Sequence, residues 1–134
     1  MTLSIGDRLP ERTFGPISRT DLVKYQGASG DFNPIHHDEE FAKRAGFPTV
    51  FSVGMLQAGY VATYLVDALG SENVRRLRVR FEEQVWPGDI ISCTAEVKGI
   101  VTDPASGERR AELEVIATRQ TGGVAIRGTS SFAF

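Results

Sequence analysis

The side chains best suited to chemistry gather in residues 29–38. This segment holds a carboxylate (Asp31), an amide (Asn33) and two imidazoles (His36 and His37) between apolar neighbours. Proline follows Asn33 and disfavours helix there, so a loop is expected, and functional groups concentrate in loops. Asp31 and His36 lie five positions apart across this turn, close enough to converge on one small molecule. A carboxylate that accepts a proton, beside an imidazole that orients or donates one, can activate water.

The same residue types allow other interpretations. Asp31 could cap backbone amides of the turn while His36 packs as a hydrogen-bonded core histidine, and the residues alone leave both possibilities open. No metal site is expected, because adjacent side chains such as His36 and His37 point to opposite sides of an extended segment. Nucleophilic catalysis is not favoured either. Ser52 is not in a Gly-x-Ser-x-Gly elbow, and Cys93 falls in a predicted strand without a basic neighbour.

A second candidate feature is the start of an apolar helix, where Ser52, Val53 and Gly54 follow one another. The first backbone N–H groups of a helix have no partner within it, and they can polarise a carbonyl or hold an anion. Gly54 has no side chain to block such an approach. Taken alone, this segment also fits an ordinary helix start that needs a small residue. Its combination with the acid–base loop in one small domain favours a functional site.

The elements that must position these groups change character halfway along the chain. Residues 1–17 are expected to be irregular or a short strand, and the first half then predicts helices from Ser18 or Thr20 to about Gly30, over 39–45, and over 54–69. The last of these is apolar almost all round and should be enclosed by other elements. The second half alternates polar and apolar residues and predicts strands at about 76–82, 91–97, 111–118 and 124–134. The pattern predicts one α+β domain over residues 1–134, with an antiparallel sheet of four or more strands curled around the long helix.

Composition narrows the class of protein. The chain has 134 residues, enough for one domain with a real core. Fifteen basic and seventeen acidic residues give a net charge of −2, which does not favour nucleic acid or an anionic membrane as a partner. Residues 47–66 are uncharged over nearly a bilayer's thickness, but they contain proline, glycine and polar residues, so no membrane span is expected. A single cysteine excludes an internal disulfide, and a cytoplasmic location is expected.

Two motifs closely resemble the MaoC-like family of (R)-specific enoyl-CoA hydratases and 3-hydroxyacyl-ACP dehydratases. They are the segment from Gly30 to His36 (GDFNPIH) and the segment from Val53 to Leu56 (VGML), supported by Arg80-Phe81 and the Val-Trp-Pro-Gly-Asp turn at 85–89. The resemblance spans nearly the whole chain. It implies a hotdog fold, in which an antiparallel sheet wraps a central helix and two sheets join in a dimer.

The resemblance also implies roles for individual residues. Asp31 and His36 match the catalytic pair that holds and activates water, and Asn33 matches the residue that supports their loop. Gly54 matches the position whose backbone N–H binds the thioester oxygen. Substrate contacts are then expected from residues around the helix start and along the helix, namely Phe51, Ser52, Val53 and Tyr60, although the two aromatic residues also fit a core role.

Two departures from the family pattern stand out. The family usually has histidine where this chain has Val53, and it often has serine where this chain has Gly59. Neither removes a proposed catalytic group, but both could reshape the acyl pocket or lower activity. They leave open a partner-dependent or non-catalytic MaoC-like subunit as the second interpretation. A hotdog thioesterase is the third and fits the Asp-x-Asn-Pro-x-His loop less well.

The implied reaction is reversible hydration of a trans-2-enoyl thioester to a (R)-3-hydroxyacyl thioester. It needs no metal or redox cofactor, and the expected partners are an acyl-CoA or an acyl-carrier-protein thioester. A homodimer or larger assembly of dimers is expected, with a heterodimer with a second hotdog subunit as the alternative. The basic stripe of Arg76, Arg78 and Arg80 could meet coenzyme A phosphates or an acidic carrier protein, but a solvated strand face is the simpler interpretation.

Overall fold

The computed structural model describes residues 1–134, which form one domain of five strands, three α-helices and two short 3₁₀ helices. In chain order these are β1 (Arg8–Phe14), α1 (Arg19–Ser29), η1 (Pro34–His36), α2 (Glu39–Arg44), α3 (Gly54–Leu69), η2 (Ser71–Asn73), β2 (Val74–Phe81), β3 (Ile91–Thr102), β4 (Arg109–Arg119) and β5 (Val124–Ala133).

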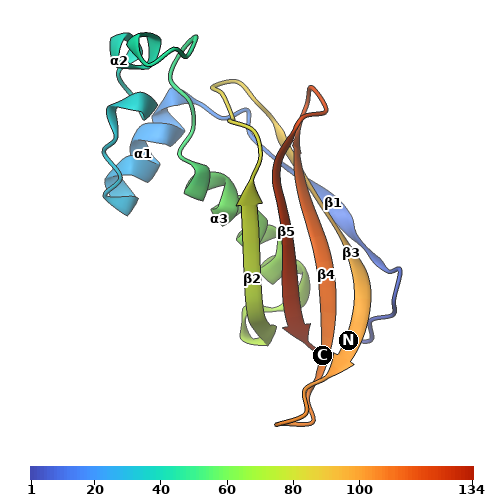
Figure 1. The fold of residues 1–134 in the computed structure, drawn as a ribbon. Helices are drawn as coiled ribbons and strands as arrows, with labels where there is room; N and C mark the ends of the chain where they lie inside the picture. Colours follow the sequence, from blue (N-terminus) through green and yellow to red (C-terminus); the bar gives the residue numbers. More distant parts are fainter.

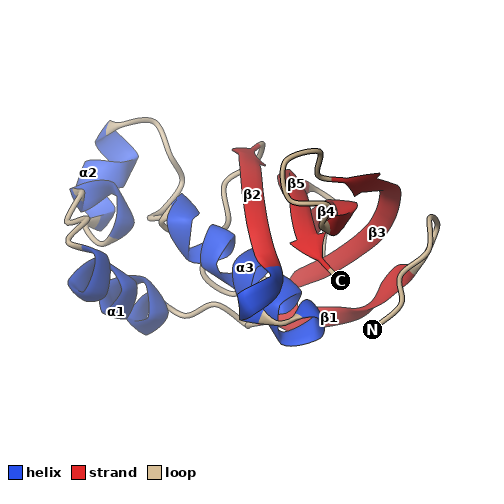
Figure 2. Cartoon of the chain, turned by 90° about the horizontal axis from the view of Figure 1, so that it is seen from below, coloured by secondary structure: helices blue, strands red, loops and turns tan.

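The strands form one antiparallel sheet in the order β1-β3-β4-β5-β2, which curls around α3 (Figures 1 and 2). The predicted curled sheet around a long helix is therefore confirmed. The first seventeen residues contain a true edge strand, β1, whose pairing with β3 shifts register between Leu9 and Arg12. The opposite edge, β2, pairs only with β5 and leaves its other side free.

The helix α3 packs one face on the sheet. Its buried side chains follow the helical repeat (Gln57, Ala58, Val61, Tyr64, Leu65 and Leu69) and join a core that includes the inward-facing residues of β3, β4 and β5. The prediction that α3 is enclosed on all sides is wrong for the single chain, because Met55 is 56% exposed and Gly59 and Thr63 are also exposed. The high apolar content of α3 led to this prediction, although one face of the helix carries small and polar residues.

The termini of the first two α-helices are set by local side chains. Ser18 accepts from the N–H of Asp21 while the Asp21 carboxylate accepts from the N–H of Ser18, the predicted capping box. Gly30 ends α1 with φ of 75°, a left-handed conformation that favours glycine. Asp38 caps α2 through the N–H of Phe41. These two helices and the loop between them project sideways past the β2 edge of the sheet, at the end away from the β3–β4 turn (Figures 1 and 2).

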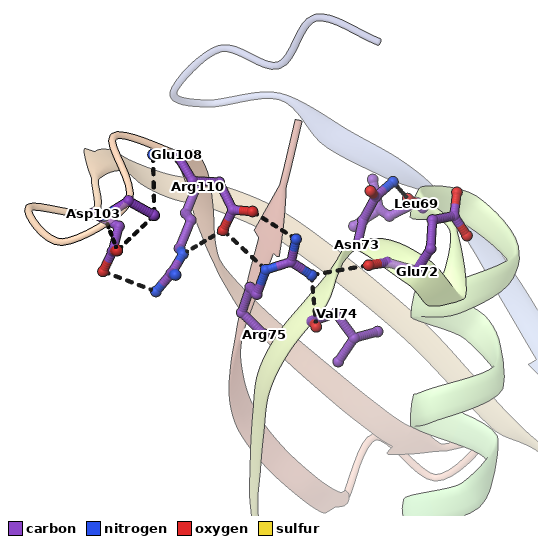
Figure 3. Close-up of polar contacts among 9 residues, drawn as sticks. Leu69, Glu72, Asn73, Val74, Arg75, Asp103, Glu108 and Arg110 are labelled. Carbon is purple, nitrogen blue, oxygen red and sulfur yellow. Dashed lines mark hydrogen bonds and ion pairs between the residues drawn. The ribbon is translucent and has the colours of Figure 1, made fainter.

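An ion-pair network ties the opposite end of the sheet together (Figure 3). Arg75 at the start of β2 makes two hydrogen bonds, of 2.9 and 2.6 Å, to the carboxylate of Glu108 just before β4, although β5 lies between these strands. Arg110 also binds Glu108, at 2.8 Å, and pairs with Asp103 in the β3–β4 turn at 3.4 Å. These hydrogen bonds lower the pKa of Glu108 to about 2.

None of the helices combines the length and the apolar character that a membrane span requires.

Candidate active site

The Asp31 loop is shaped by hydrogen bonds from its own side chains. The N–H of Asp31 donates to Ser29 Oγ at 3.2 Å, and the N–H of Asn33 donates to Asp31 Oδ1 at 3.2 Å. Asn33 Oδ1 accepts from the N–H of Ile35 at 3.1 Å and so caps η1. Asn33 therefore lies where it can support the loop, and Asp31 keeps its second carboxylate oxygen free of the turn.

That second oxygen faces His36. Asp31 Oδ2 lies 4.0 Å from His36 Nε2, so the structure brings the two candidate residues together. His36 is buried, with 9% of its side chain exposed, whereas 45% of the Asp31 side chain is exposed. Asp31 therefore caps Asn33 through one oxygen and faces an imidazole through the other, and its role in activating water stays a prediction.

The other nitrogen of His36 fixes the ring. Nδ1 lies 2.7 Å from the carbonyl oxygen of Phe51, and the ring packs edge-on against that of Phe51 with centroids 5.3 Å apart. A carbonyl can only accept, so Nδ1 carries the proton, and a neutral His36 presents a lone pair at Nε2 towards Asp31. Both groups then accept hydrogen bonds from a molecule between them.

Gln26 of α1 holds this loop and was not identified from the sequence. Its buried Nε2 donates to the carbonyl oxygens of Asp31 at 2.9 Å and Asn33 at 3.1 Å. Its Oε1 lies 3.1 Å from Nδ1 of His37, an otherwise exposed residue. The only available signal was helical spacing, which places Gln26 four residues after the buried Leu22 and on the same face.

The start of α3 provides unpaired donors. Val53 occupies the N-cap position in extended conformation without a capping side chain, and the N–H groups of Gly54 and Met55 have no partner in the chain. A Cβ on Gly54 would lie 3.1 Å from Cε1 of Phe81, so glycine lets that ring lie against the helix start. A cavity of about 240 Å³ opens here. It is lined by Phe51, Ser52, Gly54, Gln57, Phe81, Glu82, Glu83 and Gln84.

The remaining candidate residues are placed as follows. Phe51, Ser52 and Gly54 border the cavity, whereas the buried Val53 does not line it. The structure does not bring Tyr60 to the cavity, because its ring stacks on Phe14 of β1 at 4.7 Å; its role in binding stays a prediction.

Neighbouring aromatic rings support the cavity wall. Trp86 packs against Phe51 at 5.6 Å and against Phe47 at 6.5 Å. Phe47 and Phe51 also contact each other, at 4.8 Å. The three rings therefore hold in place the residue whose carbonyl fixes His36.

The structure offers little support for nucleophilic catalysis or for metal binding. Cys93 is fully buried in β3, and burial raises the pKa of its thiol to about 12, which makes it a poor nucleophile. Ser52 donates its hydroxyl proton to Gln57 and has no base beside it. No group of three or more His, Cys, Asp or Glu side chains is arranged to hold a metal ion.

Comparison with known proteins matches this architecture to one family. Residues 3–119 match the family described as MaoC like domain. The chain belongs to the MaoC-like family. It is 32% identical over 89 residues to an (R)-specific enoyl-CoA hydratase of Rhodospirillum rubrum, an alignment that covers 65% of this chain and 62% of the relative. It is 30% identical over 118 residues to 3-hydroxyacyl-thioester dehydratase Y of Mycobacterium tuberculosis, covering 82% of this chain and 41% of the relative.

A solved structure has the same fold. The (R)-hydratase from A. caviae superposes with a TM-score of 0.84 at 23% identity, covering 98% of this chain and 96% of that one. The curled sheet and central helix are therefore those of the hotdog fold. The alignments with the two curated relatives span less than two thirds of their lengths.

Proposed function

We propose that this MaoC-like protein catalyses the reversible hydration of trans-2-enoyl thioesters to (R)-3-hydroxyacyl thioesters. The observation that carries the proposal is the Asp31–His36 pair, two hydrogen-bond acceptors 4.0 Å apart beside a helix start with unpaired N–H groups. The names of the relatives, which describe enoyl hydration or hydroxyacyl dehydration, support the same reaction.

The geometry of the pair fits one water molecule. Asp31 Oδ2 and His36 Nε2 lie 4.0 Å apart, so a water oxygen about 2.8 Å from both would have them at an angle of about 91°. This is close to the angle at a water that donates both of its protons. With both protons engaged by Asp31 Oδ2 and His36 Nε2, the lone pairs of the water point away from the pair. In the proposed step one lone pair attacks C3 of the enoyl thioester, Asp31 accepts the proton, and His36 orients the water.

The electrons displaced by this attack move to the thioester oxygen. The N–H of Gly54 at the helix start is the proposed donor to that oxygen, where it stabilises the charge that develops. The proton that Asp31 accepted is then delivered to C2, which restores the carboxylate and completes the addition of one water, and the reverse sequence eliminates it. Because only a proton and a hydroxide are transferred and no electrons leave the substrate, the proposed reaction needs no redox cofactor.

The phenylalanine that anchors His36 also links the two halves of the proposed site. His36 binds the carbonyl of Phe51, and only two residues separate Phe51 from Gly54. Three residues span at most about 10 Å, so the carbonyl that anchors His36 lies within that distance of the proposed oxygen-binding N–H of Gly54.

The test is the ultraviolet absorbance of a short trans-2-enoyl-CoA, which is lost on hydration because the conjugated double bond disappears. Asp31→Asn is expected to lower turnover by about 10²–10⁴-fold while leaving the fold intact. Asp67→Asn is the matched control, since Asp67 lies on the exposed side of α3 and pairs only with Arg12. Full activity of Asp31→Asn would refute the assignment, and release of free thiol would indicate a thioesterase.

We further propose that the protein acts as a homodimer joined along β2. That strand has a free edge, and the apolar side chains of Met55, Phe81 and Phe32 are exposed in the single chain, which is typical of surfaces that are buried in an assembly. Analytical ultracentrifugation tests this directly. A monomer that becomes active only after addition of a second, different MaoC-like chain would support the partner-dependent interpretation instead.

A further inference from the structure

Gln57 is a buried polar residue that the proposed mechanism does not use. It lies one turn into α3, is 3% exposed and borders the cavity that Gly54 also lines. Side chains on a helix tilt towards its N-terminus, so the Gln57 carboxamide is directed back towards the helix start.

The orientation of this carboxamide is set by Ser52. The Ser52 hydroxyl donates to Gln57 Oε1 at 2.6 Å, and Ser52 is itself held by a 2.7 Å hydrogen bond from its N–H to the carbonyl of Val85. Because Oε1 receives this proton, the other end of the carboxamide, Nε2, presents its two N–H donors away from Ser52. The Gln57 side chain makes no other hydrogen bond within the chain.

No atom of the chain accepts a hydrogen bond from Gln57 Nε2, which is not fully buried and lies on the wall of the cavity, so an oxygen of a bound ligand can accept from it. The cavity therefore combines two kinds of donor, the backbone N–H of Gly54 and the Nε2 group of Gln57. The two carboxylates on its wall are engaged elsewhere, Glu82 with Arg80 and Arg127 and Glu83 with Arg119. An uncharged oxygen that gains negative charge during reaction is the group that these donors fit.

We propose that Gln57 Nε2 donates a hydrogen bond to the thioester carbonyl oxygen, together with the Gly54 N–H, and that Ser52 is the residue that positions it. This inference rests on the proposed function and adds a second donor to it. Since the charge on the oxygen is larger in the transition state than in the bound substrate, loss of Gln57 lowers kcat more than it raises KM.

Kinetics of two variants test the donor. Gln57→Leu retains a similar volume without a donor, and Gln57→Glu retains the shape but replaces the donor with a carboxylate. Both are expected to lose about 10²-fold in kcat with little change in KM, and Gln57→Glu is expected to lose more. Ser52→Ala frees the carboxamide to rotate and is expected to give a smaller loss. Thr63→Val, on the exposed side of the same helix, is the control and should keep full activity.

A spectroscopic measurement separates this inference from the reaction itself. Butyryl-CoA labelled with ¹³C at the thioester carbonyl cannot be hydrated, and hydrogen bonds to its oxygen lower the carbonyl stretching frequency seen by difference infrared spectroscopy. We expect a lowered frequency on binding to the wild-type protein and a partial return towards the free value in Gln57→Leu and Gln57→Glu.

The results separate the donor role of Gln57 from the proposed hydration reaction. Active wild-type protein with unchanged kcat and unchanged frequency in both Gln57 variants would overturn this inference alone. A frequency that depends on Gln57 in a protein without hydratase activity would overturn the proposed reaction and support the donor. A wild-type protein that neither hydrates the enoyl thioester nor binds butyryl-CoA would overturn both.

Discussion

Replacing Gln26 by leucine tests whether the Asp31 loop depends on a residue of α1. The substitution removes two hydrogen bonds from Nε2 to the loop carbonyls and one between Oε1 and His37. The Asn33 carbonyl keeps the N–H of His36 at 3.2 Å, but the Asp31 carbonyl has no other partner in the chain.

The magnitude follows from these contacts. A net hydrogen bond contributes about 0.5–1.5 kcal/mol, and the water that replaces Gln26 at the exposed Asp31 recovers part of the loss. A cost of about 1–2 kcal/mol to the ordered loop lowers the equilibrium constant for its ordered arrangement by roughly 5–30-fold. We expect kcat/KM for a short trans-2-enoyl-CoA to fall by up to that factor.

Two measurements check this prediction. Enoyl thioester decay gives kcat/KM, and hydrogen exchange of the Asn33, Ile35 and His36 amides, each bonded within the loop, reports its order without any reaction. Lys24→Leu, an exposed change on the same turn of α1, is the control. Unchanged exchange and unchanged kcat/KM in Gln26→Leu would refute the argument that Gln26 orders the loop.

Three further predictions concern stability and reactivity. Ser130 Oγ is buried without a hydrogen-bond partner, so Ser130→Ala should raise the free energy of unfolding in urea by about 1 kcal/mol, whereas Ser131→Ala, which loses a bond to Glu112, should lower it. Hydrogen bonds from Arg75 and Arg110 lower the pKa of Glu108 from 4.5 to about 2, so its stabilising effect is complete above about pH 5 and is lost as the pH falls towards 2. The difference in Tm between wild type and Glu108→Gln should therefore shrink over that interval, and a difference that grows on acidification would contradict the assignment. Cys93, with a pKa of about 12, should resist alkylation by iodoacetamide at pH 8 until the protein is unfolded, and rapid labelling of the native protein would show that the strand opens.

The sequence predicted those parts of the fold and of the site that depend on contacts between residues close together in the chain. The capping box at Ser18, the end of α1 at Gly30 and the convergence of Asp31 and His36 all depend on residues a few positions apart. The alternating strands were likewise visible, because one face of the sheet packs on α3.

Contacts between distant segments were not predictable in the same way. The outer face of α3 and the pairing of β1 with β3 depend on which segment folds against which, and composition does not encode this. Gln26 and Gln57 look like ordinary helix residues until the carbonyls of the loop and the hydroxyl of Ser52 are brought beside them. Polar residues on the buried face of a helix are therefore the positions where a sequence interpretation most needs the structure.

The short segment from Phe51 to Gln57 sets the spacing between the two parts of the proposed site. One end fixes the imidazole through a backbone carbonyl, and the other holds the donors through a helix start. The hydrogen bond between His36 and Phe51 is therefore a contact that ties the imidazole, between α1 and α2, to the segment that leads into α3. Inserting or deleting one residue between Phe51 and Gly54 would thus change the spacing directly, whereas a change of similar size in the β3–β4 turn at the far end of the sheet would leave it unaltered.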